Sequence, residues 1–279
     1  MILTTPAKLA LRVVALVYLA VLLAFPILTI LWRTFAPGLD VFWASIRTPA
    51  AISALNLSLL IVAIVVPLNV VFGVVTALVL VRGRFPGRRL LSGVVDLPFA
   101  VSPIVVGVAL IMLWGSQGWF GGLETLGIRV IFSVPGMVIA TIFVTLPFVV
   151  REVEPVLREI GTEQEQAATT LGASGWQTFS RITLPAIRWG LTYGIVLTVA
   201  RALGEFGAVI MVSSGFPGVS QTLTLLVHSR YIDDHNTYGA YAAATLLMMI
   251  AIVTLLLMTL LDRKRPAAHF APTPARSHS

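Results

Sequence analysis

The sequence predicts an all-α membrane protein with about six transmembrane helices. Hydrophobic residues make up 57% of its 279 residues and charged residues only 11%, whereas charged residues are about 25% of a soluble domain. The mean hydropathy is +0.95. Several uncharged runs also reach the roughly 18 residues that a helix needs to cross a bilayer. Together these observations exclude an ordinary soluble fold, and the high hydrophobicity excludes a disordered chain.

The first three predicted spans lie in the N-terminal half of the chain. The first runs from Val13 to Trp32, between two arginines, and has no small-residue cleavage site, so we expect a retained anchor rather than a signal peptide. The second lies within the uncharged run 48–81 and has a polar approach around Asn56. The third covers 97–123 and ends in an irregular glycine-rich stretch.

Three further spans are predicted in the C-terminal half. They cover 130–150, 189–212 and 235–261, and only the run 189–212 is interrupted by charges, at Arg201 and Glu205. Residues 1–265 therefore form one predicted transmembrane domain. The stretch 266–279 is rich in Pro, Ala, Ser and His and is predicted to be a disordered tail.

The distribution of basic residues predicts the orientation. With the N-terminus inside, fourteen of the nineteen lysines and arginines lie on the inner side and four lie outside. Inner loops of membrane proteins are enriched in these residues, so we expect both termini in the cytoplasm. The same rule explains the net charge of +7 without a nucleic-acid partner.

Several kinds of chemistry are excluded by residues that the chain lacks. It has no cysteine, so a disulfide framework or a thiol nucleophile is ruled out. Asp233, Asp234 and His235 lie together in an outer loop without a fourth ligand, so we expect no metal site and no catalytic residues. Neither lysine follows a glycine, so the chain has no phosphate-binding loop for ATP.

One inner loop, 151–188, is unusually long and holds five of the twelve acidic residues. Thr162 followed by Glu165, and Ser174 followed by Gln177, have the spacing of helix-capping boxes. Gly172 can close the first helix, and Pro185 is expected to stop the second. We therefore expect a helical hairpin on the cytoplasmic face. Spacing alone leaves a solvated amphipathic loop as the alternative.

The hairpin residues resemble the EAA loop of ABC-importer permeases, whose pattern is E-A-A-x3-G-x9-I-x-L-P. The chain departs only at the first position, where Gln166 replaces Glu and Glu165 stands one residue earlier. The resemblance implies that this loop contacts a partner ATPase. The residues concerned are Glu165, Gln166, Ala167, Ala168, Gly172, Ile182, Leu184 and Pro185.

A second resemblance lies downstream. The run 201–209, RALGEFGAV, is similar to the fifth-helix signature of sulfate, thiosulfate and molybdate permeases, and the stretches 171–177 and 187–191 look most like the CysW-type subunits of sulfate/thiosulfate importers. This resemblance implies the type I ABC-importer permease architecture and import by alternating access in a bacterial cytoplasmic membrane.

The family resemblance also implies a set of partners. They are a second, CysT-like permease, a dimeric CysA-like ATPase that binds ATP and Mg, a sulfate-binding protein and the lipid bilayer. This chain itself would hold no cofactor and catalyse no reaction.

Arg201 and Glu205 are the two charges predicted within a span. A charged residue at a helix centre costs roughly 2.5–3.5 kcal/mol on insertion scales. Spaced four residues apart, the two would share a helix face and neutralise each other. One interpretation places the pair on the translocation path, where Arg201 attracts an anion. The other is an ion pair that only fixes the packing of the bundle.

Weaker expectations concern three outer-loop or loop-flanking residues. His228 and Arg230 are predicted to contact the binding protein, and Asp96 is predicted to cap the third span or to pair with Arg88 or Arg89.

Three rival functions stay open: a molybdate or tungstate permease, an ion-coupled secondary transporter and a membrane enzyme. A secondary transporter needs carboxylates within the spans, where only Glu205 is available, and no cluster of catalytic spacing supports an enzyme.

Overall fold

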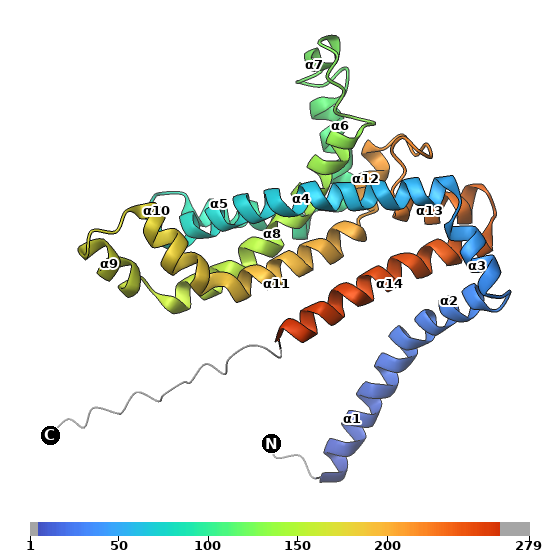
Figure 1. Ribbon diagram of the computed structural model, residues 1–279, viewed down its shortest axis with the longest axis horizontal. Helices are drawn as coiled ribbons and strands as arrows, with labels where there is room; N and C mark the ends of the chain where they lie inside the picture. Colours follow the sequence, from blue (N-terminus) through green and yellow to red (C-terminus); the bar gives the residue numbers. More distant parts are fainter. Residues whose placement is uncertain (1–4, 263–279) are drawn as a thin grey trace.

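The structure, a computed structural model, describes residues 5–262, so the predicted tail 266–279 lies outside the described residues. Every regular element within 5–262 is helical (Figure 1). The α-helices are α1 Thr5–Leu19, α2 Phe25–Phe35, α3 Leu39–Ile46, α4 Pro49–Arg82, α5 Arg88–Ala100, α6 Pro103–Trp114, α7 Gly122–Thr125, α8 Val134–Ile160, α9 Glu163–Thr170, α10 Gly175–Thr178, α11 Leu184–Leu203, α12 Gly207–Val212, α13 Leu223–His228 and α14 Thr237–Asp262. Short π-helical segments are Ala20–Ala24, Phe179–Thr183 and Ser229–Asp233.

The all-α prediction and the number of spans are confirmed. Five helical stretches are long and apolar enough to cross a membrane, and a sixth is added if the bent pair α5–α6 is one span. The five are Leu9–Phe35, Pro49–Arg82, Val134–Ile160, Gly175–Leu203 and Thr237–Leu257.

The third predicted span, 97–123, is not a straight helix. α5 ends at Ala100, and α6 leaves at an angle of 111° after a short break. Pro103 begins α6, and the preceding Ser102 is pushed out of the helical region to φ −59° and ψ 133°. A residue before proline is sterically driven to such extended angles. The proline therefore sets the bend.

The predicted boundaries around the long loop are also wrong. α8 continues past the charges at Arg151 and Glu152 to Ile160, because its buried stripe continues through Val153 and Leu157. The predicted fifth span, 189–212, is shifted toward the N-terminus and becomes Gly175–Leu203. α12 is a separate short helix after Gly204.

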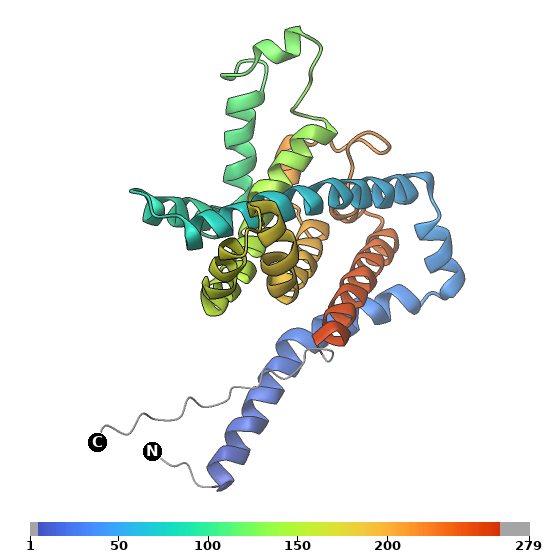
Figure 2. The ribbon, with the colours of Figure 1, turned by 60° about the vertical axis from the view of Figure 1, so that its left-hand side comes forward.

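Helices α4, α8 and α11 form a tightly packed central layer (Figures 1 and 2). Glycines permit the close approach. A side chain at Gly73 would lie 2.7 Å from the Cβ of Val149, and one at Gly194 would lie 2.9 Å from the Cα of the same valine. A buried hydrogen bond of 2.6 Å from the Asn69 amide to the Thr145 hydroxyl also joins α4 to α8. The functional segments described below attach to this layer.

The first helices lie apart from this layer. Figure 2 shows α1 extending away from the other helices, and no residue in the most apolar window of Leu9–Phe35 is buried within the chain. α2 meets α14, where the hydroxyls of Thr34 and Thr245 lie 2.7 Å apart. The surface of α1 is thus free for lipid or a neighbouring subunit.

Two polar expectations are corrected by the packing. Asp96 forms its ion pair with Arg151, which also bonds Glu154 at 2.6 Å, so α5 is fastened to α8 rather than to its own first turn. Arg230 is buried and donates to the Thr48 hydroxyl at 2.7 Å and to two backbone carbonyls, so it cannot contact a binding protein. Burial lowers the pKa of the Arg230 guanidinium from its ordinary value, and the charge of Asp234 opposes this shift.

Candidate functional site

The predicted hairpin is present, and Gly172 forms its turn. α9 ends at Thr170, and Gly172 follows with φ +84°. The amide of Ala173 donates to the carbonyl of Ala168 at 3.0 Å, which closes the end of α9. A left-handed residue after a helix is the usual position for glycine, because other residues are strained there. The prediction that Gly172 closes the first helix is therefore confirmed.

The two predicted capping boxes have different outcomes. At Ser174 the box is complete: the Gln177 amide donates to the serine hydroxyl at 3.3 Å, and the Ser174 amide donates to the Gln177 side chain at 2.8 Å. At Thr162 no side-chain cap forms. The hydroxyl of Thr162 instead accepts a bond from the Gln166 side chain at 3.1 Å, and the carboxylate of Glu165 is engaged elsewhere.

Glu165 joins the hairpin to the central layer. One of its carboxylate oxygens, Oε2, lies 3.0 Å from Nε of Arg82, at the end of α4. The other, Oε1, accepts the hydroxyl of Thr183 at 2.9 Å and Nη2 of Arg82 at 3.2 Å. This single carboxylate therefore connects α9, α4 and the segment that leads into α11.

Arg82 extends the same network to the end of α8. Its guanidinium donates to the carbonyl of Leu157 at 3.2 Å and to the carbonyl of Gly161 at 2.5 Å. Helix ends leave carbonyls without intrahelical partners, and a cation is favourable there. We call Arg82, Glu165 and Thr183 the anchor cluster. The sequence analysis did not predict this cluster, because nothing in the sequence distinguishes Arg82 from the other arginines predicted on the inner side.

The remaining motif residues are mostly exposed and take no part in the anchor cluster. Gln166, Ala167 and Gly172 are exposed, as are Leu184 and Pro185, while Ala168 and Ile182 are half-buried. The prediction that the second helix stops before Pro185 is wrong. The chain continues through the π-helical segment Phe179–Thr183 into α11, so the proline ring and its missing amide fall at an already irregular turn.

Two large apolar side chains at the hairpin tip were also missed. Leu171 is 89% exposed and Trp176 is 73% exposed, and the Trp176 ring lies 5.7 Å from the Phe179 ring. Exposed tryptophan is enriched among the residues that carry the binding energy of protein interfaces. The outer surface of the hairpin thus combines small residues with two apolar projections.

We expect Gly172→Glu to leave the protein in the membrane but to uncouple transport. A non-glycine residue at φ +84° is strained by roughly 1–2 kcal/mol. Apart from Gly172 and its two neighbours, no heavy atom of residues 5–262 lies within 4 Å of the added Cβ, so the hairpin keeps its place while its docking surface gains a bulky charge. Uptake and ATP hydrolysis by the assembled complex are the measurements.

The matched control is Gln166→Glu, which restores the residue usual in the family and should be tolerated. Normal ATP-dependent uptake by Gly172→Glu would contradict the role of the hairpin. Loss of uptake in Gln166→Glu would mean that this loop docks differently from the loops it resembles.

Arg201 and Glu205 form an ion pair, with Nη1 and Oε2 separated by 2.6 Å. They do not share one helix face, however, because α11 ends at Leu203 and Glu205 lies beyond it. The exposures of the two side chains differ strongly, 33% for Arg201 and 1% for Glu205. The Arg201 side chain is therefore partly accessible, whereas the Glu205 side chain is buried.

Glu205 holds the break between α11 and α12. Its Oε1 accepts the amide of Ala208, in the first turn of α12, at 2.8 Å. Its carbonyl accepts the hydroxyl of Thr224 at 2.9 Å, which ties in α13. Glu205 therefore ties α11, α12 and α13 together at this break, while about a third of the Arg201 side chain stays exposed.

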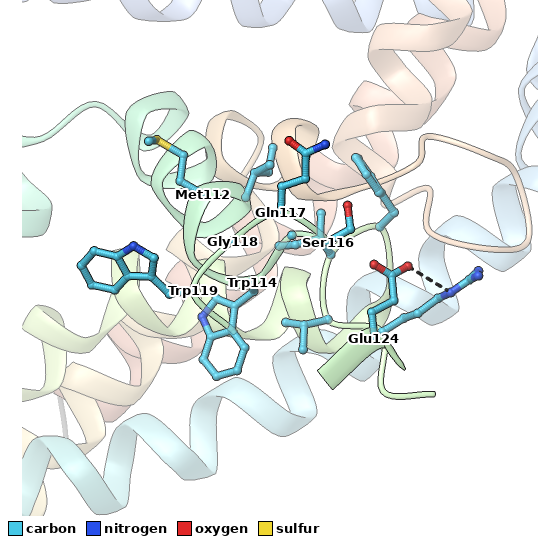
Figure 3. Close-up of a pocket in the computed structure, with 13 residues that line it drawn as sticks. Met112, Trp114, Ser116, Gln117, Gly118, Trp119 and Glu124 are labelled. Atoms are coloured by element: carbon cyan, nitrogen blue, oxygen red, sulfur yellow. Dashed lines mark ion pairs between the residues drawn. The ribbon is translucent and has the colours of Figure 1, made fainter. Parts of the chain in front are cut away.

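Two of the cavities bear on the predicted residues or their surroundings. One, of about 470 Å³, is lined by apolar residues together with Thr224 and His228, and neither Arg201 nor Glu205 is among its lining residues; the His228 ring lies 5.3 Å from Phe206. The other, of about 580 Å³, lies on the segment between α6 and α8, where Glu124 and Arg129 form an ion pair of 3.5 Å (Figure 3). No group of three or more His, Cys, Asp or Glu side chains that could hold a metal occurs within the described residues.

Comparison with known proteins agrees with the motifs. Residues 69–265 match the family described as "Binding-protein-dependent transport system inner membrane component". The chain is 48% identical to the sulfate transport system permease protein CysW of Synechocystis, over 94% of this chain and 95% of that protein. It is 36% identical to the CysT protein of the same organism, over 90% and 88%.

The fold also matches solved structures. A bacterial ABC transporter for import of the acidic polysaccharide alginate aligns with a TM-score of 0.76 at 19% identity, covering 92% of this chain and 94% of that one. At this identity the similarity concerns the fold alone.

Proposed function

Because the chain belongs to the family of binding-protein-dependent transport system inner membrane components, we propose that it is the CysW-type permease subunit of an ATP-driven importer of sulfate or thiosulfate. The observation that carries the ATP-driven part is the hairpin, which is fixed to the central layer on one side and free on the other. The substrate is proposed from the relatives. The chain is similar to a sulfate transport system permease protein over nearly the whole length of both proteins.

The proposed mechanism divides the work between chains. A partner ATPase binds ATP and Mg and receives the outer surface of α9 and α10. When it closes, the hairpin moves, and the anchor cluster transmits that motion to α4, α8 and α11 together. The permeases then alternate between inward-facing and outward-facing states. This chain moves the anion and hydrolyses nothing.

The proposed path for the anion includes Arg201. Its partly exposed guanidinium offers positive potential, while a weak contact is an advantage because a tightly held anion would leave slowly. A sulfate-binding protein on the outer side supplies selectivity. The second subunit is a CysT-like permease, and the assembly lies in a bacterial cytoplasmic membrane with both termini of this chain inside.

The test is to purify the chain with its neighbouring permease and ATPase and to measure ATP hydrolysis with each oxyanion-loaded binding protein. Sulfate-loaded or thiosulfate-loaded protein should stimulate hydrolysis, and molybdate-loaded protein should not. Stimulation by molybdate alone would instead identify a molybdate permease.

A further inference from the structure

A basic groove lies where the hairpin joins α11. It has a volume of about 500 Å³ and is lined by Gln164, Arg181, Ile182, Pro185, Ala186, Arg188 and Trp189. The opposite side of this segment is buried: Thr183, Ile187 and Gly190 face the central layer. A side chain at Gly190 would lie 2.6 Å from the carbonyl of Glu152 in α8. The groove therefore faces away from the body of the protein.

The two arginines of this groove have no acidic partner. Neither forms an ion pair with any residue between 5 and 262, whereas Arg82, Arg151 and Arg158 on the same side of the protein all do. The guanidinium of Arg188 lies 5.4 Å from the centre of the Trp189 ring. A cation at this distance from an aromatic ring is attracted to it, and the contact does not use the N–H donors of the guanidinium.

The chemistry of the groove suits a phosphate group at a membrane surface. Guanidinium groups bind phosphate oxygens in a bidentate manner, and tryptophan is enriched at the level of lipid headgroups. Ile182, Pro185 and Ala186 supply apolar surface beside the charges. The inner leaflet of a cell membrane is rich in anionic lipid, which basic pockets between helices bind.

We propose that this groove binds the phosphate of an anionic phospholipid in the inner leaflet. The lipid neutralises Arg181 and Arg188 and steadies the segment through which the hairpin continues into α11. The inference requires only that the chain lies in a membrane with the hairpin at the inner surface, so it does not depend on which anion is transported.

The experiment uses the complete complex of this chain with its second permease and ATPase, after removal of copurified lipid. Binding of phosphatidylglycerol and of phosphatidylcholine is counted by native mass spectrometry. The variant is Arg181→Gln with Arg188→Gln. The matched control is Arg84→Gln with Arg89→Gln, which removes the same charge from two exposed arginines, one in the α4–α5 loop and one in the first turn of α5.

The affinity for phosphatidylglycerol should fall by about 30-fold in the groove variant, since each arginine near an anionic surface contributes on the order of 1 kcal/mol. The control should change by less than about twofold, and phosphatidylcholine should bind weakly to both. Arg181→Lys with Arg188→Lys keeps the charge but not the forked donors, so it should retain an intermediate affinity. This variant keeps the test valid if the glutamine variant does not fold.

Three results would overturn the proposal. Equal loss in the groove variant and the control would show unspecific surface attraction. Displacement of the lipid by millimolar inorganic phosphate would assign the groove to a free anion. Release of the ATPase from the groove variant with unchanged lipid binding would assign the groove to the ATPase interface.

Discussion

Arg82→Ala is expected to abolish coupled transport while the complex still assembles. The change removes the ion pair to Glu165 and the hydrogen bonds to the carbonyls of Leu157 and Gly161. A hydrogen bond to a charged group contributes about 1.5–3 kcal/mol, and 1.4 kcal/mol is a factor of ten. Without these bonds the hairpin moves independently of α4 and α8. We therefore expect uptake to fall by at least about tenfold, toward the level measured without ATP, while ATP hydrolysis persists.

Two further variants make this result specific. Arg84→Ala removes an exposed arginine two residues away that has no ion pair among the described residues, and it should transport normally. Arg82→Lys keeps one charge but cannot reach two carbonyls and a carboxylate at once, so its uptake should be intermediate. An unchanged number of ATP molecules hydrolysed per anion in Arg82→Ala would contradict the anchoring role.

The second large effect concerns Arg201 and Glu205. If Arg201 attracts the passing anion, Arg201→Gln should cut uptake strongly while the complex assembles, and Arg201→Lys should retain part of it. Glu205→Gln should mainly weaken assembly, because the carboxylate bonds the amide of Ala208 and lies 1% exposed beside Arg201. Removing one partner of a buried pair typically costs about 3–5 kcal/mol, whereas replacing both can be neutral.

The two interpretations separate in a double-mutant cycle on assembly and on uptake. We expect Arg201→Gln with Glu205→Gln to recover assembly relative to the worse single variant, with uptake still lost. Recovery of both assembly and uptake in the double variant would contradict a role of Arg201 in the anion path. It would show that the ion pair only fixes the packing of the helices.

Much of this architecture can be predicted from the sequence because its signals are local. Long uncharged runs predict spans wherever a helix crosses a bilayer undisturbed, as in α4 and α14. The Ser174 box and the turn at Gly172 depend on residues within one or two helical turns. These predictions are confirmed, since nothing distant competes with them.

The failures among polar residues have a common physical cause, which is competition from residues distant in sequence. The Thr162 box fails because Glu165 binds Arg82, 83 residues away. Asp96 forms its ion pair with Arg151 of α8 rather than with a residue of its own helix, and the buried Arg230 donates a hydrogen bond to Thr48. The predictions around two prolines fail for a different, local reason. Pro103 accompanies a bend of 111° between α5 and α6, whereas the helix continues through Pro185 after the π-helical segment Phe179–Thr183.

The central claim is that this chain converts ATP hydrolysis by a partner into anion import. The most direct test is uptake of labelled sulfate into proteoliposomes that contain the complete complex, with the binding protein outside and ATP on the side of the hairpin. We predict uptake that requires ATP, persists without any ion gradient and is lost in Arg82→Ala. Uptake driven by an ion gradient in the absence of ATP would contradict the claim and identify a secondary transporter.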